Sequence, residues 1–129
     1  MEIIQIYGEN YIEQYAKIRE ACRGIVVRNG KILLTYEVNT NQWFIPGGGL
    51  ESNESLSQCC IRELAEETGC VVEVGEQYLT IKEHYDDWLW VSHYYICNYI
   101  GKTERILAQR EYEVGLEPRW ISLEKAIDI

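Results

Sequence analysis

Residues 48–70 read GGLESNESLSQCCIRELAEETGC, and Gly47 directly before them completes a run of three glycines. Glycine has no Cβ atom, so three in succession permit backbone angles and close approaches that other residues forbid. Such a run is typical of a loop with a functional contact. We therefore expect a functional loop at 47–49, with an acidic segment directly after it.

The segment after the glycines carries the signals of a helix. Ser55 with Gln58 three residues later resembles a capping box, and neither glycine nor proline follows until Gly69. Gly69 then supplies a helix stop. The pattern predicts a helix over residues 55–68, about four turns long.

Three carboxylates share one side of this predicted helix. At roughly 100° per residue, Glu63, Glu66 and Glu67 fall within an arc of about 100°. The opposite side is expected to face the core and carries Ile61, Leu64, Ala65 and Thr68. Carboxylates at these spacings repel by roughly a few tenths of a kcal/mol each in water, and a bound cation would reverse that sign. The alternative is a solvated acidic face, on which Arg62 offsets the repulsion or holds one carboxylate in place.

The spacing of these residues matches a known pattern. Gly48, Glu54, the run Arg62-Glu63-Leu64, the pair Glu66-Glu67 and Gly69 followed by apolar Cys70 resemble an intact Nudix box. The approach from Trp43 to Gly48 also resembles that of MutT-like members of the family. The box covers 23 residues, and a looser similarity in length and element order extends over about residues 22 to 127.

The resemblance implies a fold and an activity. The fold would be of the α+β class, a Nudix-type α/β/α sandwich with a mixed sheet and a long catalytic helix. The activity would be hydrolysis of a phosphate anhydride in a nucleoside diphosphate linked to another moiety, with Mg²⁺ or its substitute Mn²⁺. Mg²⁺ prefers oxygen ligands and commonly binds one or two carboxylates together with substrate phosphates, so carboxylates on a rigid helix agree with this activity.

The resemblance also assigns roles to single residues. It implies Glu63, Glu66 and Glu67 as metal ligands, with the backbone carbonyl of Gly47 as a further ligand. Arg62 would orient a box glutamate, and Glu54 would complete that network or contact a metal through water. Gly48 and Gly49 would let the backbone approach the phosphates.

The general base is open at this point. The family uses a box glutamate in some members and a glutamate on a later loop in others, and Glu111 and Glu113 are the candidates for the loop role. For each of them, a solvated surface glutamate is the competing interpretation. The aromatic residues after the box are candidates for stacking on a base, although core packing is the more common role of aromatic residues in strands. They are Tyr85, Trp88, Trp90, Tyr94, Tyr95 and Tyr99.

The resemblance implies a small-molecule nucleotide or another diphosphate as the substrate. The chain lacks the proline that often follows the box in members acting on ADP-ribose, which weighs against that substrate. A nucleoside triphosphate is the default. Two further hypotheses stay open: a nucleotide-sensing module without turnover, and a hydrolase of a non-nucleotide such as an isoprenoid or inositol diphosphate.

The segments before and after the box contain signals for strands, turns and a short helix. Residues 24–36 contain two β-rich runs around Asn29-Gly30, which is a strong hairpin signal. Strands are expected over 71–74, 78–85, 89–100 and 118–123, with a turn at Asp86-Asp87 and the start of a helix at 124–129. Ile3, Ile4 and Ile6 can form a short strand, and residues 11–20 are left as a helical turn or an extended arm.

Composition limits the remaining possibilities. The chain has 129 residues, enough for a single domain over 1–129, and it has no apolar run of about 18 residues and no signal-peptide pattern. Five cysteines without a CxxC pair read as reduced thiols, so a cytoplasmic location is expected. A net charge of -9 disfavours non-specific attraction to nucleic acid or an anionic membrane, so neither is an expected partner. A homodimer is left open.

Overall fold

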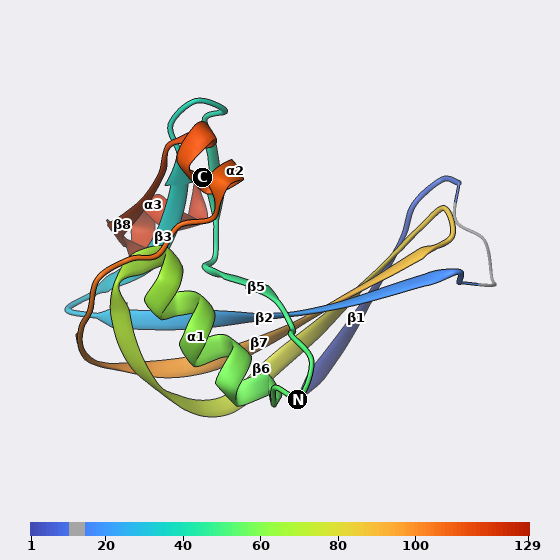
Figure 1. The fold of residues 1–129 in the computed structure, drawn as a ribbon, viewed down its shortest axis with the longest axis horizontal. Coiled ribbons are helices and arrows are strands. Elements are labelled where there is room, and N and C mark those ends of the chain that lie inside the picture. Colours follow the sequence, from blue (N-terminus) through green and yellow to red (C-terminus); the bar gives the residue numbers. More distant parts are fainter. Residues whose placement is uncertain (11–14) are drawn as a thin grey trace.

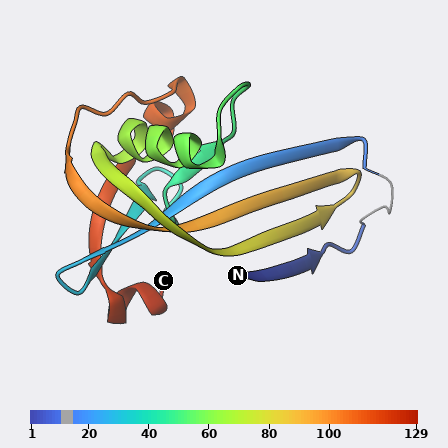
Figure 2. The same cartoon turned by 90° about the horizontal axis from the view of Figure 1, so that it is seen from below.

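The computed structural model describes residues 1–10 and 15–129. Eight strands and three helices follow one another in these residues. They are β1 (Glu2–Tyr7), β2 (Lys17–Arg28), β3 (Lys31–Glu37), β4 (Gln42–Phe44), β5 (Gly47–Gly49), α1 (Leu56–Thr68), β6 (Cys70–Tyr85), β7 (Trp88–Lys102), α2 (Gln109–Val114), β8 (Leu116–Ser122) and α3 (Leu123–Ile127). Figure 1 shows α1 lying across the sheet, and Figure 2 shows the strands between α1 and α3.

The sheet is mixed, as the α+β fold class predicted. Its order is β1-β6-β7-β2-β3-β4, with β5 paired to β2 and β8 paired to β3. The pairs β1/β6 and β2/β7 are parallel, and the other pairs are antiparallel. Strand β2 is central because it contacts β7 along most of its length and the glycine strand β5 on its other side.

Several elements agree with the local sequence signals. The hairpin is confirmed, with Val27 opposite Ile32 around the Asn29-Gly30 turn. The turn at Asp86-Asp87 joins β6 to β7, and the run of isoleucines near the start lies in β1. Residues 17–20 of the segment left open belong to β2, whereas residues 11–14 lie outside the described residues.

Other elements differ from expectation. The two strands expected over 71–74 and 78–85 are one strand, β6, which continues through Gly75 and Glu76 by register shifts in its pairing with β7. A bulge keeps a strand in the sheet where its alternation is interrupted. Helix α2 was not expected, because only six residues form it.

The core lies between α1 and the sheet. Leu64 packs directly on β2, since a Cβ atom added at Gly24 would lie 2.6 Å from its Cδ2. Sulfur atoms fill much of this space: Cys22, Cys59, Cys60, Cys70 and Cys97 are all buried and free. Among the described residues, no helix is long and apolar enough to cross a membrane.

Candidate active site

Helix α1 begins and ends as its sequence predicts. Ser55 is the N-cap: the Gln58 N–H donates to its hydroxyl oxygen (3.1 Å), and the Ser55 N–H donates to Gln58 Oε1 (2.9 Å). Gly69 ends the helix in the left-handed conformation at φ 71°. The predicted helix over 55–68 is therefore confirmed, and its caps fix where its carboxylates stand relative to the glycines.

The glycine strand β5 lies against the carboxylate side of α1. A Cβ atom added at Gly48 would be 2.5 Å from Cδ of Glu63, and one added at Gly47 would be 2.0 Å from the backbone oxygen of Cys22. Real Cβ atoms do not approach other atoms so closely. Glycine is therefore required here for close packing between β2, β5 and α1.

Arg62 is the centre of an ion-pair network beside this strand. Its Nε and Nη2 donate to the two oxygens of Glu54 at 2.6 and 3.0 Å, a bidentate pair. Its Nη1 donates to Glu63 (2.8 Å) and Glu66 (3.2 Å), and Nη2 donates to the carbonyl oxygen of Gly49 (3.0 Å). The bonds from Arg62 to Glu54 lower the pKa of Glu54 to about 2. The structure thus brings Arg62 and Glu54 together and ties them to Glu63, Glu66 and β5.

Glu67 occupies the most protected position. Its side chain is buried, with the residue 8% exposed, and the Gly47 N–H donates to its Oε1 at 2.9 Å. Burial raises the pKa of Glu67 to about 9; the bond from Gly47 opposes the rise, and the nearby Glu111 and Glu63 add to it. Burial and the two neighbouring carboxylates therefore both disfavour the charged form of Glu67.

The expected division of the helix into a core side and a carboxylate side needs correction. Ile61, expected to face the core, is 39% exposed, whereas Glu67 is buried. Cys59 is also buried, one turn before Glu63 on the carboxylate side, where its Sγ lies 3.5 Å from the Gly48 carbonyl oxygen. The reason is that β5 covers the carboxylate side, which a helical wheel of α1 alone does not show.

The two candidates for the general base separate in the structure. Helix α2 places Glu111 on a cavity of about 470 Å³ that Gly47 and Glu67 also line. Glu113 is not among the residues that line this cavity, and its Oε1 accepts a bond from Gln109 Nε2 at 3.2 Å. Glu111 also accepts a bond from the N–H of Ala108, the residue that caps α2 (2.8 Å). An acidic residue three positions after a cap is a sequence signal for the start of a helix, and it could have indicated α2.

The same cavity contains residues that the sequence did not single out. Arg23 and Arg110 line it, together with the aromatic side chains of Phe44 and Trp90. Of these four, only Trp90 was among the aromatic candidates named above for a base contact. Arg23 lies between Cys22 and Gly24, which are both buried, in the apolar part of a strand. A cation within an apolar strand segment needs a partner or a function, and this could have indicated Arg23 as a site residue.

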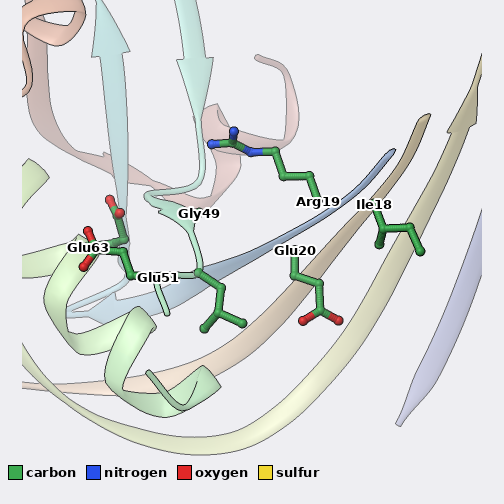
Figure 3. Close-up of a pocket in the computed structure, with 7 residues that line it drawn as sticks. Ile18, Arg19, Glu20, Gly49, Glu51 and Glu63 are labelled. Carbon is green, nitrogen blue, oxygen red and sulfur yellow. The ribbon is translucent and has the colours of Figure 1, made fainter. Parts of the chain in front are cut away.

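A second cavity of about 570 Å³ opens on another side of the glycine strand (Figure 3). It is lined by Ile18, Arg19, Glu20, Gly49, Leu50, Glu51 and Glu63. Glu63 therefore borders this cavity, and Glu67 borders the first. A ligand that contacts the glycine strand would therefore lie between Glu63 on one side and Glu67 on the other.

The donor set can be compared with what a divalent cation needs. In the described parts of the chain, no three histidine, cysteine or acidic side chains already converge as a metal site. Arg62 explains part of this, because it binds Glu63 and Glu66 itself. The donors nevertheless fit a hard cation: they are carboxylate oxygens, and Glu67 is buried near Glu63 and Glu111, where a bound cation would favour its charged form.

The comparisons with known proteins agree with this geometry. A family model described as the NUDIX domain matches residues 18–129. The RNA pyrophosphohydrolase of Sphingopyxis alaskensis is 23% identical over 121 residues, which are 79% of this chain and 77% of that protein. The RNA pyrophosphohydrolase of Haemophilus influenzae is 44% identical over 107 residues, which are 81% of this chain and 49% of that protein. The chain thus spans about half of the length of the second relative.

Solved structures show the same fold. The solution structure of the Escherichia coli ORF135 protein has a TM-score of 0.66 and 28% identity, covering 87% of this chain and 79% of that chain. Fold, site and comparisons together define a hydrolase that acts on phosphate anhydrides. The chain belongs to the NUDIX family, as its box predicted. Hydrolases of this family generally use divalent metal ions.

Proposed function

We propose that the protein hydrolyses a phosphate anhydride in a nucleoside diphosphate linked to another moiety, with Mg²⁺ or, as a substitute, Mn²⁺. The observation that carries this proposal is the position of Glu67. It is buried against the glycine strand, bonded to the Gly47 N–H, and next to Glu63 and Glu111. A cation at this position would balance the carboxylates and draw substrate phosphates towards β5.

Glu63, Glu66 and Glu67 would hold the cation, with the carbonyl oxygen of Gly47 as a further ligand. The bound cation would neutralise charge on the phosphates and acidify a water molecule. Arg62 keeps Glu63 and Glu66 in place and, through Glu54, ties them to the segment before the helix. Gly48 and Gly49 leave space for phosphate oxygens beside the backbone.

Glu111 is the residue that we assign as general base. It lines the cavity beside Glu67, within reach of the same ligand, whereas Glu113 does not line that cavity. Its carboxylate would take a proton from water as the water oxygen forms a bond to phosphorus. The anhydride oxygen leaves with the electron pair of the broken P–O bond.

A nucleotide is favoured over other diphosphates by the aromatic part of the cavity. Phe44 and Trp90 present apolar ring surface next to Arg23, which suits a base beside a phosphate. The names of the two RNA pyrophosphohydrolases also favour a nucleotide-type substrate. We further propose a single domain over 1–129, and the five free cysteines support a cytoplasmic location.

A hydrolysis screen tests this function. Nucleoside triphosphates, dinucleotides, nucleotide sugars and non-nucleotide diphosphates are incubated with the protein in Mg²⁺ and in chelator, and phosphorus NMR identifies the products. We expect Mg²⁺-dependent cleavage of at least one nucleotide and a loss of at least about 100-fold in Glu67→Gln with the fold intact. Equal rates in chelator and in Mg²⁺ would refute the proposal. Cleavage of non-nucleotides alone, or binding without turnover, would favour the corresponding alternative.

A further inference from the structure

One face of the sheet carries a repeated arrangement of cations and aromatic rings. In the parallel pair of β2 and β7, Lys17 is opposite Trp88, Arg19 is opposite Trp90, and Arg23 is opposite Tyr94. Alternate residues of a strand point to the same face, so these six side chains share one face of the sheet. We call these six residues the cationic–aromatic strip.

The strip lies on the face of the sheet that α1 does not cover. Residues of opposite parity in the same strands, such as Cys22, Val91 and Tyr95, are buried. Figures 1 and 2 show β2 and β7 side by side and running past the end of α1. Among the described residues, no helix covers the outer part of these strands. Lys17, Arg19 and Trp90 are exposed, whereas Trp88, Arg23 and Tyr94 are half-buried, so a ligand can reach the outer part of the strip directly.

The cations and rings of the strip contact one another. Nζ of Lys17 lies 4.8 Å from the ring centroid of Trp88, and Cζ of Arg19 lies 5.3 Å from that of Trp90. The two tryptophan rings are stacked, with centroids 5.1 Å apart and planes 21° from each other. Within residues 1–10 and 15–129, neither Lys17 nor Arg19 forms a salt bridge. Two cations of one strand thus contact rings and no carboxylate, although the chain as a whole carries a net charge of -9.

The strip ends at the active site. Trp90 and Arg23 line the cavity that contains Glu67, and Arg19 lines the cavity that contains Glu63. The guanidinium of Arg19 lies over the glycine strand, since a Cβ atom added at Gly49 would be 2.9 Å from its Nη2 (Figure 3). A ligand whose phosphates occupy β5 can therefore continue along the strip without leaving the protein surface.

We propose that the cationic–aromatic strip binds a single-stranded nucleic acid whose phosphorylated 5′ end lies in the active site. This inference rests on the proposed function, because it names what is attached to the nucleotide that is cleaved. Proteins that bind single strands combine cations that follow the phosphates with aromatic rings that stack on bases. From Lys17 to Arg23 the strip extends about 20 Å, six residues at roughly 3.3 Å each. A mononucleotide in the active site would not reach Lys17, whereas a short oligonucleotide would.

Acidic groups limit the strength of this binding. Glu83 of β6 is opposite Trp90 and faces the same side, and Asp86-Asp87 close the outer end of the strip. The net charge of the chain disfavours non-specific attraction, as the composition indicated. The strip thus suits a strand that is held by its 5′ end and gains a few contacts beyond it. Binding should be moderate in affinity and sensitive to salt.

Binding is measured with an eight-nucleotide single-stranded RNA that carries a 5′ phosphate and a 3′ fluorophore. A 5′ monophosphate contains no anhydride, so fluorescence anisotropy with the whole chain in Mg²⁺ measures binding without turnover. Three phosphate contacts give an expected slope of log K against log salt of about -2, since each contributes about 0.7. Lys17→Ala should reduce the size of this slope by about 0.7. Lys31→Ala is the matched control, because Lys31 is exposed at the start of β3 and lies outside the strip.

Trp88 tests the stacking part of the strip. Loss of one stacked base corresponds to about 5-fold weaker binding or more, so Trp88→Ala should raise the Kd for the octamer by at least that factor. Trp88→Phe keeps an aromatic ring and should retain most of the affinity. Circular dichroism of both variants separates this effect from misfolding, and the phenylalanine variant keeps the test valid if the alanine variant does not fold.

Turnover provides a second measurement. For the same octamer with a 5′ triphosphate, Lys17→Ala should raise KM relative to Lys31→Ala and leave kcat unchanged. Absence of octamer binding at low salt, or equal affinities of Lys17→Ala and Lys31→Ala, would overturn the inference. It would also be overturned by a dimer that Trp88→Ala dissociates in sedimentation, because a second copy would then cover the strip. Cleavage of mononucleotides in Mg²⁺ is unaffected by these outcomes and tests the proposed function separately.

Discussion

Alanine substitutions in the glycine strand should separate damage to the site from damage to the fold. At Gly48 the added Cβ would lie 2.5 Å from the carboxyl carbon of Glu63. Ordinary carbon contacts are about 3.5–4.0 Å, so the Glu63 carboxylate must move by about 1 Å. It is the end of a flexible side chain, but its bond to Arg62 opposes the movement. We expect a cost of about 1 kcal/mol in the free energy of unfolding and, because a displacement of about 1 Å is enough, a loss of about 100-fold in activity.

Two further glycines calibrate this result. At Gly47 the added Cβ meets backbone atoms, 2.0 Å from the Cys22 oxygen, and backbone cannot move aside, so Gly47→Ala should lower stability by about 3 kcal/mol or more. At Gly101 nothing lies within 4 Å, and Gly101→Ala should change stability by no more than about 0.5 kcal/mol. Urea unfolding measures stability, and Mg²⁺-dependent hydrolysis of the best substrate from the screen measures activity. Activity of Gly48→Ala within 3-fold of Gly101→Ala would refute the reasoning.

Three other predictions concern the charged residues of the site. Arg62→Ala leaves Glu54 and Glu63 without their main partner, and urea unfolding should show a loss of about 3 kcal/mol in the free energy of unfolding. This value is at the lower end of the range for buried pairs because the Arg62 side chain is 22% exposed. A loss below about 1 kcal/mol would contradict this prediction. The pKa of Glu54 is lowered to about 2 in the folded protein, so its contribution to stability is present above about pH 4.5 and is lost as the pH falls towards 2. Glu54→Gln should therefore flatten the dependence of unfolding free energy on pH in that window, and an unchanged dependence would count against the Arg62–Glu54 pair. Glu111→Gln should lower kcat by about 100-fold or more, whereas Glu113→Gln should stay within about 3-fold; similar losses in both would exclude Glu111 as the specific base.

Local signals explain why part of the fold could be predicted. The hairpin around Asn29-Gly30 and the helix between Ser55 and Gly69 depend on turn and capping residues that act over a few positions. The order of strands around them was not predicted, because it depends on pairing between distant segments. The parallel pairing of β2 with β7 is an example, since nothing in either strand specifies its partner.

The site could be predicted only where its residues belong to one motif. Glu63, Glu66 and Glu67 were found by their spacing, but the burial of Glu67 follows from β5 packing on α1, and β5 forms by pairing with β2. Glu111 was one of two equal candidates until α2 placed it on the cavity. Arg23 and Arg19 were missed because their importance comes from the neighbouring strand and the glycines, which only the folded structure brings to them.

The five buried cysteines make the chain a reporter of its own unfolding. Burial raises the pKa values of the Cys22 and Cys59 thiols, and the hydrogen bond between Cys60 and Cys97, together with burial, raises that of Cys60. All five cysteines are buried, so a reagent does not reach them in the folded state. A maleimide should therefore leave the native protein unmodified and attach at up to five positions once the chain opens. Mass spectrometry after a short pulse would then count opened molecules directly, without an added dye or an engineered label.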